Sequence, residues 1–249
     1  MKIKLLRDDL LDLQITLKKE YLLTNGNGGY ASSTILDCHT RKYHGLLVLP
    51  LKEQQGKLFN LLSKIEATVV FNKKEFNLAT NKFPGVYSPT GHKYIDSFEY
   101  QHFPVTTYTV GDTVIQKSVL MPEGKNTVLV KYEVLDAAKP VQLKFRPLLS
   151  YRDVHGLSKR NMDILPRTYF EKNGFKINPY PNLPSLYLQT SIKSVFYPSP
   201  EWWYDFEYLK ERNRGYGYQE DLFAPGVFEA KLRKGQSIIF RASLDELKG

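Results

Sequence analysis

The chain of 249 residues is 42% hydrophobic and 24% charged, a composition typical of globular proteins that excludes collagen, coiled coils and intrinsic disorder. The formal net charge is +9, but no block of five like charges occurs, so nucleic acid is not an expected partner. Aromatic residues make up 13% of the chain, which suits a large β-rich core and also supplies rings on which a ligand can stack.

Alternating apolar residues and β-branched runs predict a succession of short strands from about residue 44 onward. We expect strands at Leu46–Leu49, Lys64–Phe71, Glu75–Thr80, Val105–Val110, Thr113–Met121, Asn126–Leu135, Val141–Leu149, Gly174–Ile177, Leu186–Gln189, Gly226–Leu232 and Gln236–Ala242. Turn residues such as Gly111-Asp112 and Lys234-Gly235 separate them. Short strands with a turn signal roughly every 8–12 residues predict an all-β fold, a large antiparallel β-sandwich with few short helices.

Two later segments depart from this pattern. Residues 178–200 are expected to form loops interleaved with short strands, because they contain five prolines: Pro179, Pro181, Pro184, Pro198 and Pro200. Residues 202–213 (WWYDFEYLKERN) are compatible with a short helix that places Trp203 and Phe206 on one side.

The last residues resemble a helix start. Ser243-Leu-Asp-Glu246 fits a capping box, in which the serine caps an amide and the glutamate reaches back. A helix from Ser243 to Gly249 is too short to be stable alone. Two interpretations stay open: a chain cut in a linker or at the first helix of a further domain, or a frayed terminal turn. We therefore divide the chain into one β-sandwich domain over 1–242 and the start of a linker or helix over 243–249.

The start of the chain and its single cysteine indicate a cytoplasmic protein. Residues 1–9 (MKIKLLRDD) lack the apolar segment of a signal peptide. Cys38 is the only cysteine, so no disulfide can form within the chain. Apolar stretches such as Gly45–Leu51 are far too short to span a bilayer, and we expect no membrane partner.

No cofactor or metal is expected. The glycine-rich segment Thr24–Tyr30 (TNGNGGY) lacks the lysine and the spacing of phosphate-binding loops, so it predicts a tight turn with positive φ at its glycines. Cys38, His39 and His44 are metal-ligand types, but the sequence holds no second ligand pair.

Two polar clusters border apolar strands. Thr40–Gly45 (TRKYHG) precedes Leu46–Leu49, and Arg152-Asp153-Val-His155 follows the strand Val141–Leu149. Polar side chains that lead into a buried strand cost desolvation free energy unless they meet a partner. That partner can be a sugar, another domain or only the local backbone, and an arginine beside an aspartate is often a plain structural ion pair.

The densest aromatic cluster is Glu201–Tyr208, followed by Arg212–Tyr218 and Glu220-Asp221. Aromatic faces bind sugar rings while carboxylates and arginines bind their hydroxyls, and two carboxylates at a fixed separation can hydrolyse a glycosidic bond. The same residue types are also enriched at domain interfaces. Spacing alone does not decide among these roles.

Taken together, these segments resemble the N-terminal domain of the glycogen debranching enzyme (amylo-α-1,6-glucosidase) family of the bacterial and archaeal type. The resemblance extends in order over nearly the whole chain, and the string TRKYHGLL is fairly specific. The family often has tryptophan at the position of Tyr21, and Asn27 in the glycine-rich turn is a second departure. The matching segments are 20–32, 40–48, 62–64, 98–104, 117–121, 146–147, 152–155, 203–208 and 220–226.

The resemblance implies a supersandwich-like β-domain placed before a helical (α/α) toroid. In the family the catalytic carboxylates belong to the toroid, which this chain lacks, so no catalytic residue is expected here. The family hydrolyses the α-1,6-linked glucose stub left on glycogen. The implied partners are the C-terminal (α/α) catalytic domain and a branched α-glucan such as glycogen or limit dextrin, and segment 243–249 is then expected to lead toward the missing toroid.

Three hypotheses follow. The first is a non-catalytic β-domain of a cytoplasmic debranching enzyme, which packs on the catalytic domain and helps shape the branched-glucan site. The second is a free-standing glucan-binding module, and the third is a complete glycosidase that uses carboxylates such as Asp153, Glu220 and Asp221. The residues expected to face the catalytic domain or the substrate are Arg41, Tyr43, His44, Arg152, Asp153, His155, Trp202, Trp203, Glu220 and Asp221.

Overall fold

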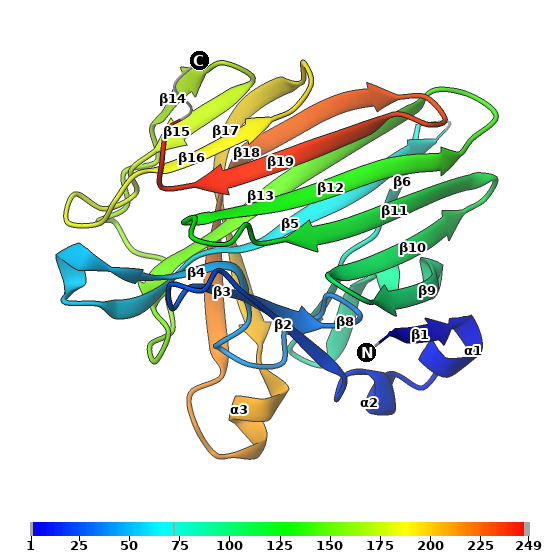
Figure 1. Ribbon diagram of the computed structural model, residues 1–249. Helices are drawn as coiled ribbons and strands as arrows, with labels where there is room; N and C mark the ends of the chain where they lie inside the picture. The colour runs from blue at the N-terminus through cyan, green and yellow to red at the C-terminus, as the bar shows by residue number, and fades with distance from the viewer. Residues whose placement is uncertain (1, 72, 247–249) are drawn as a thin grey trace.

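Two large antiparallel sheets pack face to face in the computed structural model, which describes residues 2–71 and 73–246 (Figure 1). The nine-stranded sheet has the order β1 (Ile3–Leu6), β9 (Ile95–Tyr100), β10 (Pro104–Val110), β11 (Thr113–Leu120), β12 (Thr127–Asp136), β19 (Ser237–Ser243), β16 (Leu186–Thr190), β15 (Gly174–Ile177) and β14 (Thr168–Glu171). The predicted all-β sandwich is confirmed, and each predicted strand overlaps an observed one.

The eight-stranded sheet holds the longest strands. Its order is β17 (Val195–Glu207), β18 (Gln219–Leu232), β13 (Val141–Asp153), β5 (Lys57–Phe71), β4 (Gly45–Leu51), β3 (Tyr30–Thr34) and β2 (Glu20–Thr24), with β6 (Lys74–Asn77) paired to β5. The remaining elements are the hairpin β7 (Thr80–Phe83) and β8 (Val86–Thr90), the helices α1 (Arg7–Leu10), α2 (Leu13–Thr16) and α3 (Leu209–Asn213), and the 3₁₀ turns η1 (Lys52–Gln54) and η2 (Gly91–Tyr94).

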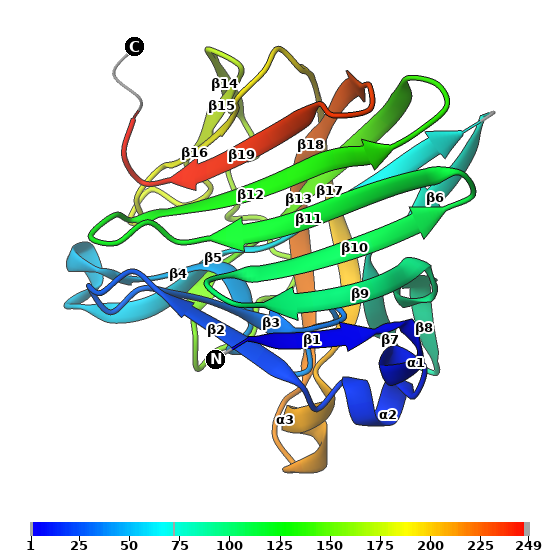
Figure 2. The ribbon, with the colours of Figure 1, turned by 45° about the vertical axis from the view of Figure 1, so that its right-hand side comes forward.

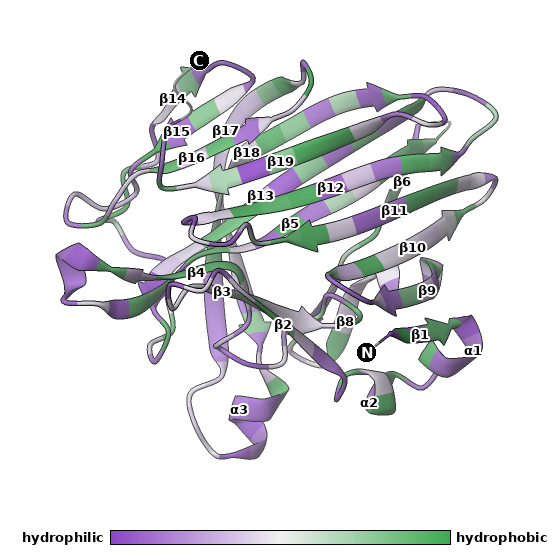
Figure 3. Ribbon diagram, viewed as in Figure 1, coloured by the Kyte–Doolittle hydropathy of each residue, from purple (hydrophilic) through white to green (hydrophobic). Residues whose placement is uncertain are grey.

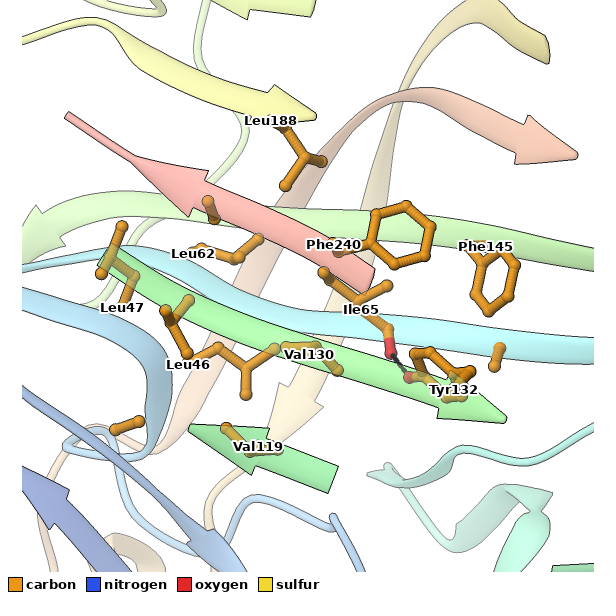
Figure 4. Packing of buried hydrophobic residues seen from close by; sticks show 14 of the residues in the cluster. Leu46, Leu47, Leu62, Ile65, Val119, Val130, Tyr132, Phe145, Leu188 and Phe240 are labelled. Carbon is orange, nitrogen blue, oxygen red and sulfur yellow. Dashed lines mark hydrogen bonds between the residues drawn. The ribbon is translucent and has the colours of Figure 1, made fainter. Parts of the chain in front are cut away.

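Period-2 alternation explains how the strands build the core (Figure 3). In β12, Val128, Val130, Tyr132 and Val134 are buried, while the residues between them face outward. Aromatic rings from both sheets then meet in the centre of the sandwich (Figure 4). The Phe145 ring lies 4.9 Å from that of Tyr132 and 4.8 Å from that of Phe240, measured between centroids. The Tyr132 hydroxyl donates to the Ile65 carbonyl oxygen at 3.0 Å, so its polar atom is satisfied.

The predicted helix over 202–213 is wrong in its first half. β17 continues to Glu207, and α3 covers only Leu209–Asn213. The cause is pairing with β18, in which Trp202 lies opposite Phe223 and Trp203 opposite Leu222. Long-range pairing therefore overrides the local helical pattern. β17 also holds Pro198 and Pro200, which fits its position at the edge of the sheet, where a missing backbone donor is tolerated.

The described part of segment 243–249 is not helical. Ser243 is the last residue of β19, and its hydroxyl accepts a hydrogen bond from the Asp245 amide at 3.0 Å. This bond is to the amide two residues on, not to the Glu246 amide of the expected capping box, and residues 244–246 form no helical turn. Residues 247–249 lie outside the described residues. None of the described helices has the length and apolar character needed to cross a membrane.

The glycine-rich segment forms the predicted tight turn between β2 and β3. Gly26 and Gly28 have φ of 76° and 82°. The Asn25 side chain closes the turn by accepting from the amides of Asn27 and Gly29, both at 2.9 Å. This is an Asx-type turn and needs no ligand for its hydrogen bonds.

Candidate functional site

Three connecting segments meet at one end of the eight-stranded sheet, where β17 and β18 run down to α3 (Figures 1 and 2). The segments are 35–44 between β3 and β4, 154–160 after β13, and 208–218, which carries α3. The Lys210 amide donates to the Thr40 carbonyl oxygen at 2.8 Å and Lys42 Nζ to that of His155 at 2.8 Å, which joins the three segments, and the Asp221 amide of β18 donates to the Ser158 carbonyl oxygen at 2.9 Å. We call this region the loop end.

A buried ion pair holds the loop end together. The Arg152 side chain is 7% exposed and the Glu220 side chain is fully buried. Arg152 Nη2 lies 2.9 Å from Glu220 Oε2, and Arg152 Nε donates to the other carboxylate oxygen. The guanidinium also donates to the carbonyl oxygen of Lys42 at 2.8 Å, so one arginine connects β13, β18 and segment 35–44.

Glu220 accepts further hydrogen bonds from two other segments. The Ser158 amide donates to Glu220 Oε1 at 3.0 Å, and the Tyr208 hydroxyl donates to Oε2. Burial, reinforced by the Glu220 carboxylate, raises the pKa of the Tyr208 phenol well above its ordinary value, so it stays a donor. The fully buried Glu220 carboxylate thus links all three segments of the loop end, through its own hydrogen bonds and through Arg152.

A β-bulge in β13 orients the Arg152 side chain toward Glu220. The register of β13 against β5 shifts between Leu149 and Arg152, and Tyr151 within this shift has φ of 45°. A positive φ is strained for a bulky residue. The bulge is supported on the other side, because the Tyr151 hydroxyl donates to the Pro184 carbonyl oxygen at 3.1 Å.

Asp221, next to Glu220, braces a second bulge. It accepts hydrogen bonds from the amides of Arg160 at 2.9 Å and Asp205 at 3.0 Å, and Lys159 Nζ lies 3.3 Å away. Asp205 has φ of 58° where the register of β17 shifts. Burial raises the pKa of Asp221, but the two amides and Lys159 outweigh this and lower it. Asp153 Oδ1 likewise accepts from the His155 amide at 2.8 Å.

Arg41 and His44 share Glu20 as their partner. Arg41 Nε lies 3.0 Å from both oxygens of Glu20, and His44 Nε2 lies 3.7 Å from Oε1. The Thr40 amide donates to His44 Nδ1 at 3.2 Å, which places the proton of the neutral ring on Nε2, toward Glu20. Burial lowers the pKa of His44 in spite of the nearby carboxylate.

The Glu20 carboxyl predicts a measurable pH dependence. Burial raises its pKa, but His44 and Arg41 outweigh that effect and lower it from 4.5 to about 2. Because the pKa is lower in the folded state, the ionised Glu20 carboxylate stabilises the fold above pH 4.5. This contribution is lost as the pH falls from 4.5 toward 2. We expect Glu20→Gln to flatten this part of the stability profile, measured by urea unfolding between about pH 2 and pH 7.

The matched control is Glu99→Gln, which removes a surface carboxylate paired with Lys4 at 3.0 Å. This variant is expected to lose stability at acidic pH in the same way as the wild type, because exposed ion pairs contribute little to the free energy of unfolding. If Glu20→Gln loses stability at acidic pH just as the wild type does, the Glu20 carboxylate does not stabilise the folded state.

Cations and tyrosine rings alternate on the exposed side of the loop end. Lys42 Nζ lies 5.6 Å from the ring centroid of Tyr43 and 6.0 Å from that of Tyr216, and the Arg214 guanidinium lies 4.9 Å from the Tyr216 centroid. The Tyr43 and His155 rings meet edge to face at 5.7 Å. We call Lys42, Tyr43, His155, Arg214 and Tyr216 the cation–tyrosine surface. Rings and cations in this pattern bind protein partners or sugars.

The structure brings most of the predicted site residues together. Eight lie at or beside the loop end: Arg41, Tyr43, His44, Arg152, Asp153, His155, Glu220 and Asp221. The two tryptophans do not join them. The Trp202 ring packs on Phe223 at 5.5 Å, whereas the neighbouring Trp203 lies under the Arg146 guanidinium at 4.6 Å. Adjacent strand residues point to opposite faces, so the two rings cannot form one platform.

Sequence reasoning missed Ser158 and Tyr208, which complete the Glu220 site. They lie 62 and 12 residues from Glu220 along the chain; Tyr208 ends the aromatic cluster Glu201–Tyr208, but no local motif links either residue to Glu220. It also missed Lys42 and Tyr216 individually, although TRKYHG and the stretch Arg212–Tyr218 drew attention to their surroundings. Among residues 2–71 and 73–246, no group of three or more His, Cys, Asp or Glu side chains is placed to hold a metal ion.

Comparisons with known proteins give one family match. The sequence family described as "Glycogen debranching enzyme N terminal" matches residues 19–239. Among solved structures, the chain is similar to a bacterial glucoamylase complexed with acarbose, with 10% identity and a TM-score of 0.45 over 93% of this chain and 31% of that one. It is also similar to a mutant heparan sulfate lyase HepC from Pedobacter heparinus, with 17% identity and a TM-score of 0.36 over 81% of this chain and 24% of that one.

The chain thus spans less than a third of the length of these two structures. A search of curated proteins finds no significant match.

Proposed function

The chain belongs to the family of glycogen debranching enzyme N-terminal domains, as its sequence resemblance predicted, and on that premise we propose that it is the non-catalytic β-domain of a cytoplasmic debranching enzyme. Its loop end packs on an (α/α) catalytic domain and helps to shape the site for a branched α-glucan. Hydrolysis of the α-1,6 bond is carried out by the catalytic domain.

The observation that carries this proposal is that an exposed surface of cations and tyrosine rings lies on loops held in place by a buried ion pair. The buried Arg152–Glu220 pair joins the three segments of the loop end, and the cation–tyrosine surface lies on them. Preorganised loops lose little conformational entropy on binding, and tyrosine and arginine dominate the energetics of interfaces. Tyr216 is 54% exposed and is therefore available to a partner.

The state of the carboxylates supports a non-catalytic role. A glycosidase needs an acid and a base or nucleophile that flank the scissile bond. Glu220 is buried under Arg152, and Asp221 is occupied by two backbone amides. These two side chains therefore serve the fold, and of the three carboxylates named in the complete-glycosidase hypothesis only Asp153, which accepts from the His155 amide, is left.

The test is complex formation between this chain and an (α/α) glucosidase domain of the same family, followed by gel filtration and titration. We expect a complex whose dissociation constant rises at least about tenfold in Arg214→Ala/Tyr216→Ala, because truncated interface anchors commonly cost more than 1.4 kcal/mol. Tyr216→Ala alone should leave the unfolding midpoint unchanged, since this side chain is exposed, whereas Arg214 also lies 3.9 Å from the buried Glu211 carboxylate, so the midpoint of the double variant is measured alongside its affinity.

The matched control is Arg167→Ala/Tyr169→Ala, which removes a cation over a tyrosine ring at the same 4.9 Å, but at β14 and the residue before it, away from the loop end. No complex, or an equal loss in both double variants, would overturn the proposed packing surface. Glucose release from limit dextrin by the 249-residue chain alone would overturn the non-catalytic role.

A further inference from the structure

A groove lies on the outer face of the eight-stranded sheet, separate from the loop end. It has a cavity volume of about 320 Å³, and its walls include Glu75, Lys144, Arg146, Tyr197 and Glu229. Leu143 and Phe145 of β13 point into the core, so Lys144 and Arg146 between and beyond them point outward. Lys144 is paired in register with Thr68 of β5 and Glu229 of β18, which builds the floor from three strands.

The charges of the groove nearly cancel. Lys144 Nζ lies 2.7 Å from Glu75 Oε1 and 3.8 Å from Glu229 Oε1. Arg146 Nε lies 3.3 Å from Oε1 of Glu201, a third carboxylate that is not itself among the lining residues. Two cations and three carboxylates give no excess positive charge to attract an anion. An apolar ligand would desolvate these charged groups without giving them hydrogen bonds.

Arg146 is held in place but makes no hydrogen bond to the described residues. Its buried Nε faces the Glu201 carboxylate at 3.3 Å without a hydrogen bond, and its guanidinium lies over the Trp203 ring at 4.6 Å. Stacking fixes the guanidinium plane, so its donors are oriented before a ligand arrives. Its two Nη groups, which make no hydrogen bond to the described residues, are therefore oriented donors beside the groove and can act as a binding element.

Tyr197 adds an apolar surface to these polar groups. Its side chain is 51% exposed on the edge strand β17, opposite Val227 of β18. The face of a tyrosine ring packs against the C–H face of a sugar ring. Each sugar hydroxyl both donates and accepts, so a sugar can satisfy Arg146, Lys144 and the carboxylates together.

We propose that this groove binds a neutral oligosaccharide, with one sugar ring on Tyr197 and hydroxyls hydrogen-bonded to Arg146, Lys144 and Glu229. The site lies outside the surface assigned to the catalytic domain and shares no residue with it. A glucan held here would be bound by the β-domain itself, without any contribution from the loop end.

The test is titration of the 249-residue chain with maltoheptaose, followed by calorimetry and by tryptophan fluorescence, since a ligand of Arg146 alters the surroundings of Trp203. We expect Tyr197→Ala and Arg146→Ala each to weaken binding at least about fivefold, the loss of one aromatic or charged hydrogen-bonding contact. Tyr204→Ala is the matched control, because Tyr204 is on the same strand and is 48% exposed but does not line the groove.

Absence of binding at millimolar maltoheptaose, or unchanged binding in both groove variants, would overturn the proposal. So would an equal loss in Tyr204→Ala, or tighter binding of inorganic phosphate or a sulfated oligosaccharide at the same residues. These outcomes are independent of the complex with the (α/α) domain, which is tested through Arg214 and Tyr216, so either proposal can fail while the other holds.

Discussion

Replacement of Phe145 by alanine is expected to lower the free energy of unfolding by about 3–5 kcal/mol, the range for large aromatic truncations in a core. Phe145 is fully buried, and its ring contacts Tyr132 and Phe240 of the opposite sheet. The neighbours are themselves fixed by other contacts, since Tyr132 donates to the Ile65 carbonyl oxygen. The cavity therefore cannot close by collapse, and the loss of stability should fall in the upper part of this range.

Urea unfolding of Phe145→Ala and wild type measures the difference, with Phe170→Ala as the control. Phe170 is 69% exposed, so its truncation should change stability by no more than about 0.5 kcal/mol. A loss below about 1.5 kcal/mol in Phe145→Ala would show that the aromatic rings rearrange to fill the space.

The core strands were predictable because their burial is periodic. β11 and β12 alternate buried and half-buried residues, and this alternation is visible in the sequence as a period of two. Outer strands carry a weaker signal. β1 has no fully buried residue and β2 has one, so their pairing partners, rather than their own pattern, define them as strands.

The candidate site was predictable in its chemistry but not in its geometry. Arg152 could be selected as a polar residue after a buried strand and Glu220 as a carboxylate after the aromatic cluster, but their contact spans 68 residues. The contact also depends on the bulge at Tyr151, and no glycine or other turn residue in the sequence predicts a bulge there. The two tryptophans do not form one cluster, because neighbouring residues of a strand face opposite sides. A helix over 202–213 does not predict this separation.

The second large effect is expected for Arg152→Met, which removes the charge but keeps much of the side-chain volume. Glu220 would then stay buried as a carboxylate with only the donors of Ser158 and Tyr208. Breaking a buried pair in this way costs about 3–5 kcal/mol, because an uncompensated charge is left in a medium of low dielectric constant. The measurement is again urea unfolding at neutral pH.

A double-mutant cycle separates the pair from the packing of its side chains. Since Arg152→Met/Glu220→Met leaves no buried charge, its loss of stability should be smaller than the sum of the single losses by about 1–3 kcal/mol. The exposed pair Arg7–Asp96, at 3.0 Å, is the control and should give a coupling below about 1 kcal/mol. Additive losses at Arg152 and Glu220 would mean that the loop end is held by its backbone hydrogen bonds instead. In that case Arg152→Met should also leave the affinity for the (α/α) domain unchanged. If the ion pair instead fixes the cation–tyrosine surface, Arg152→Met should weaken binding of the (α/α) domain even though Tyr216 is still present.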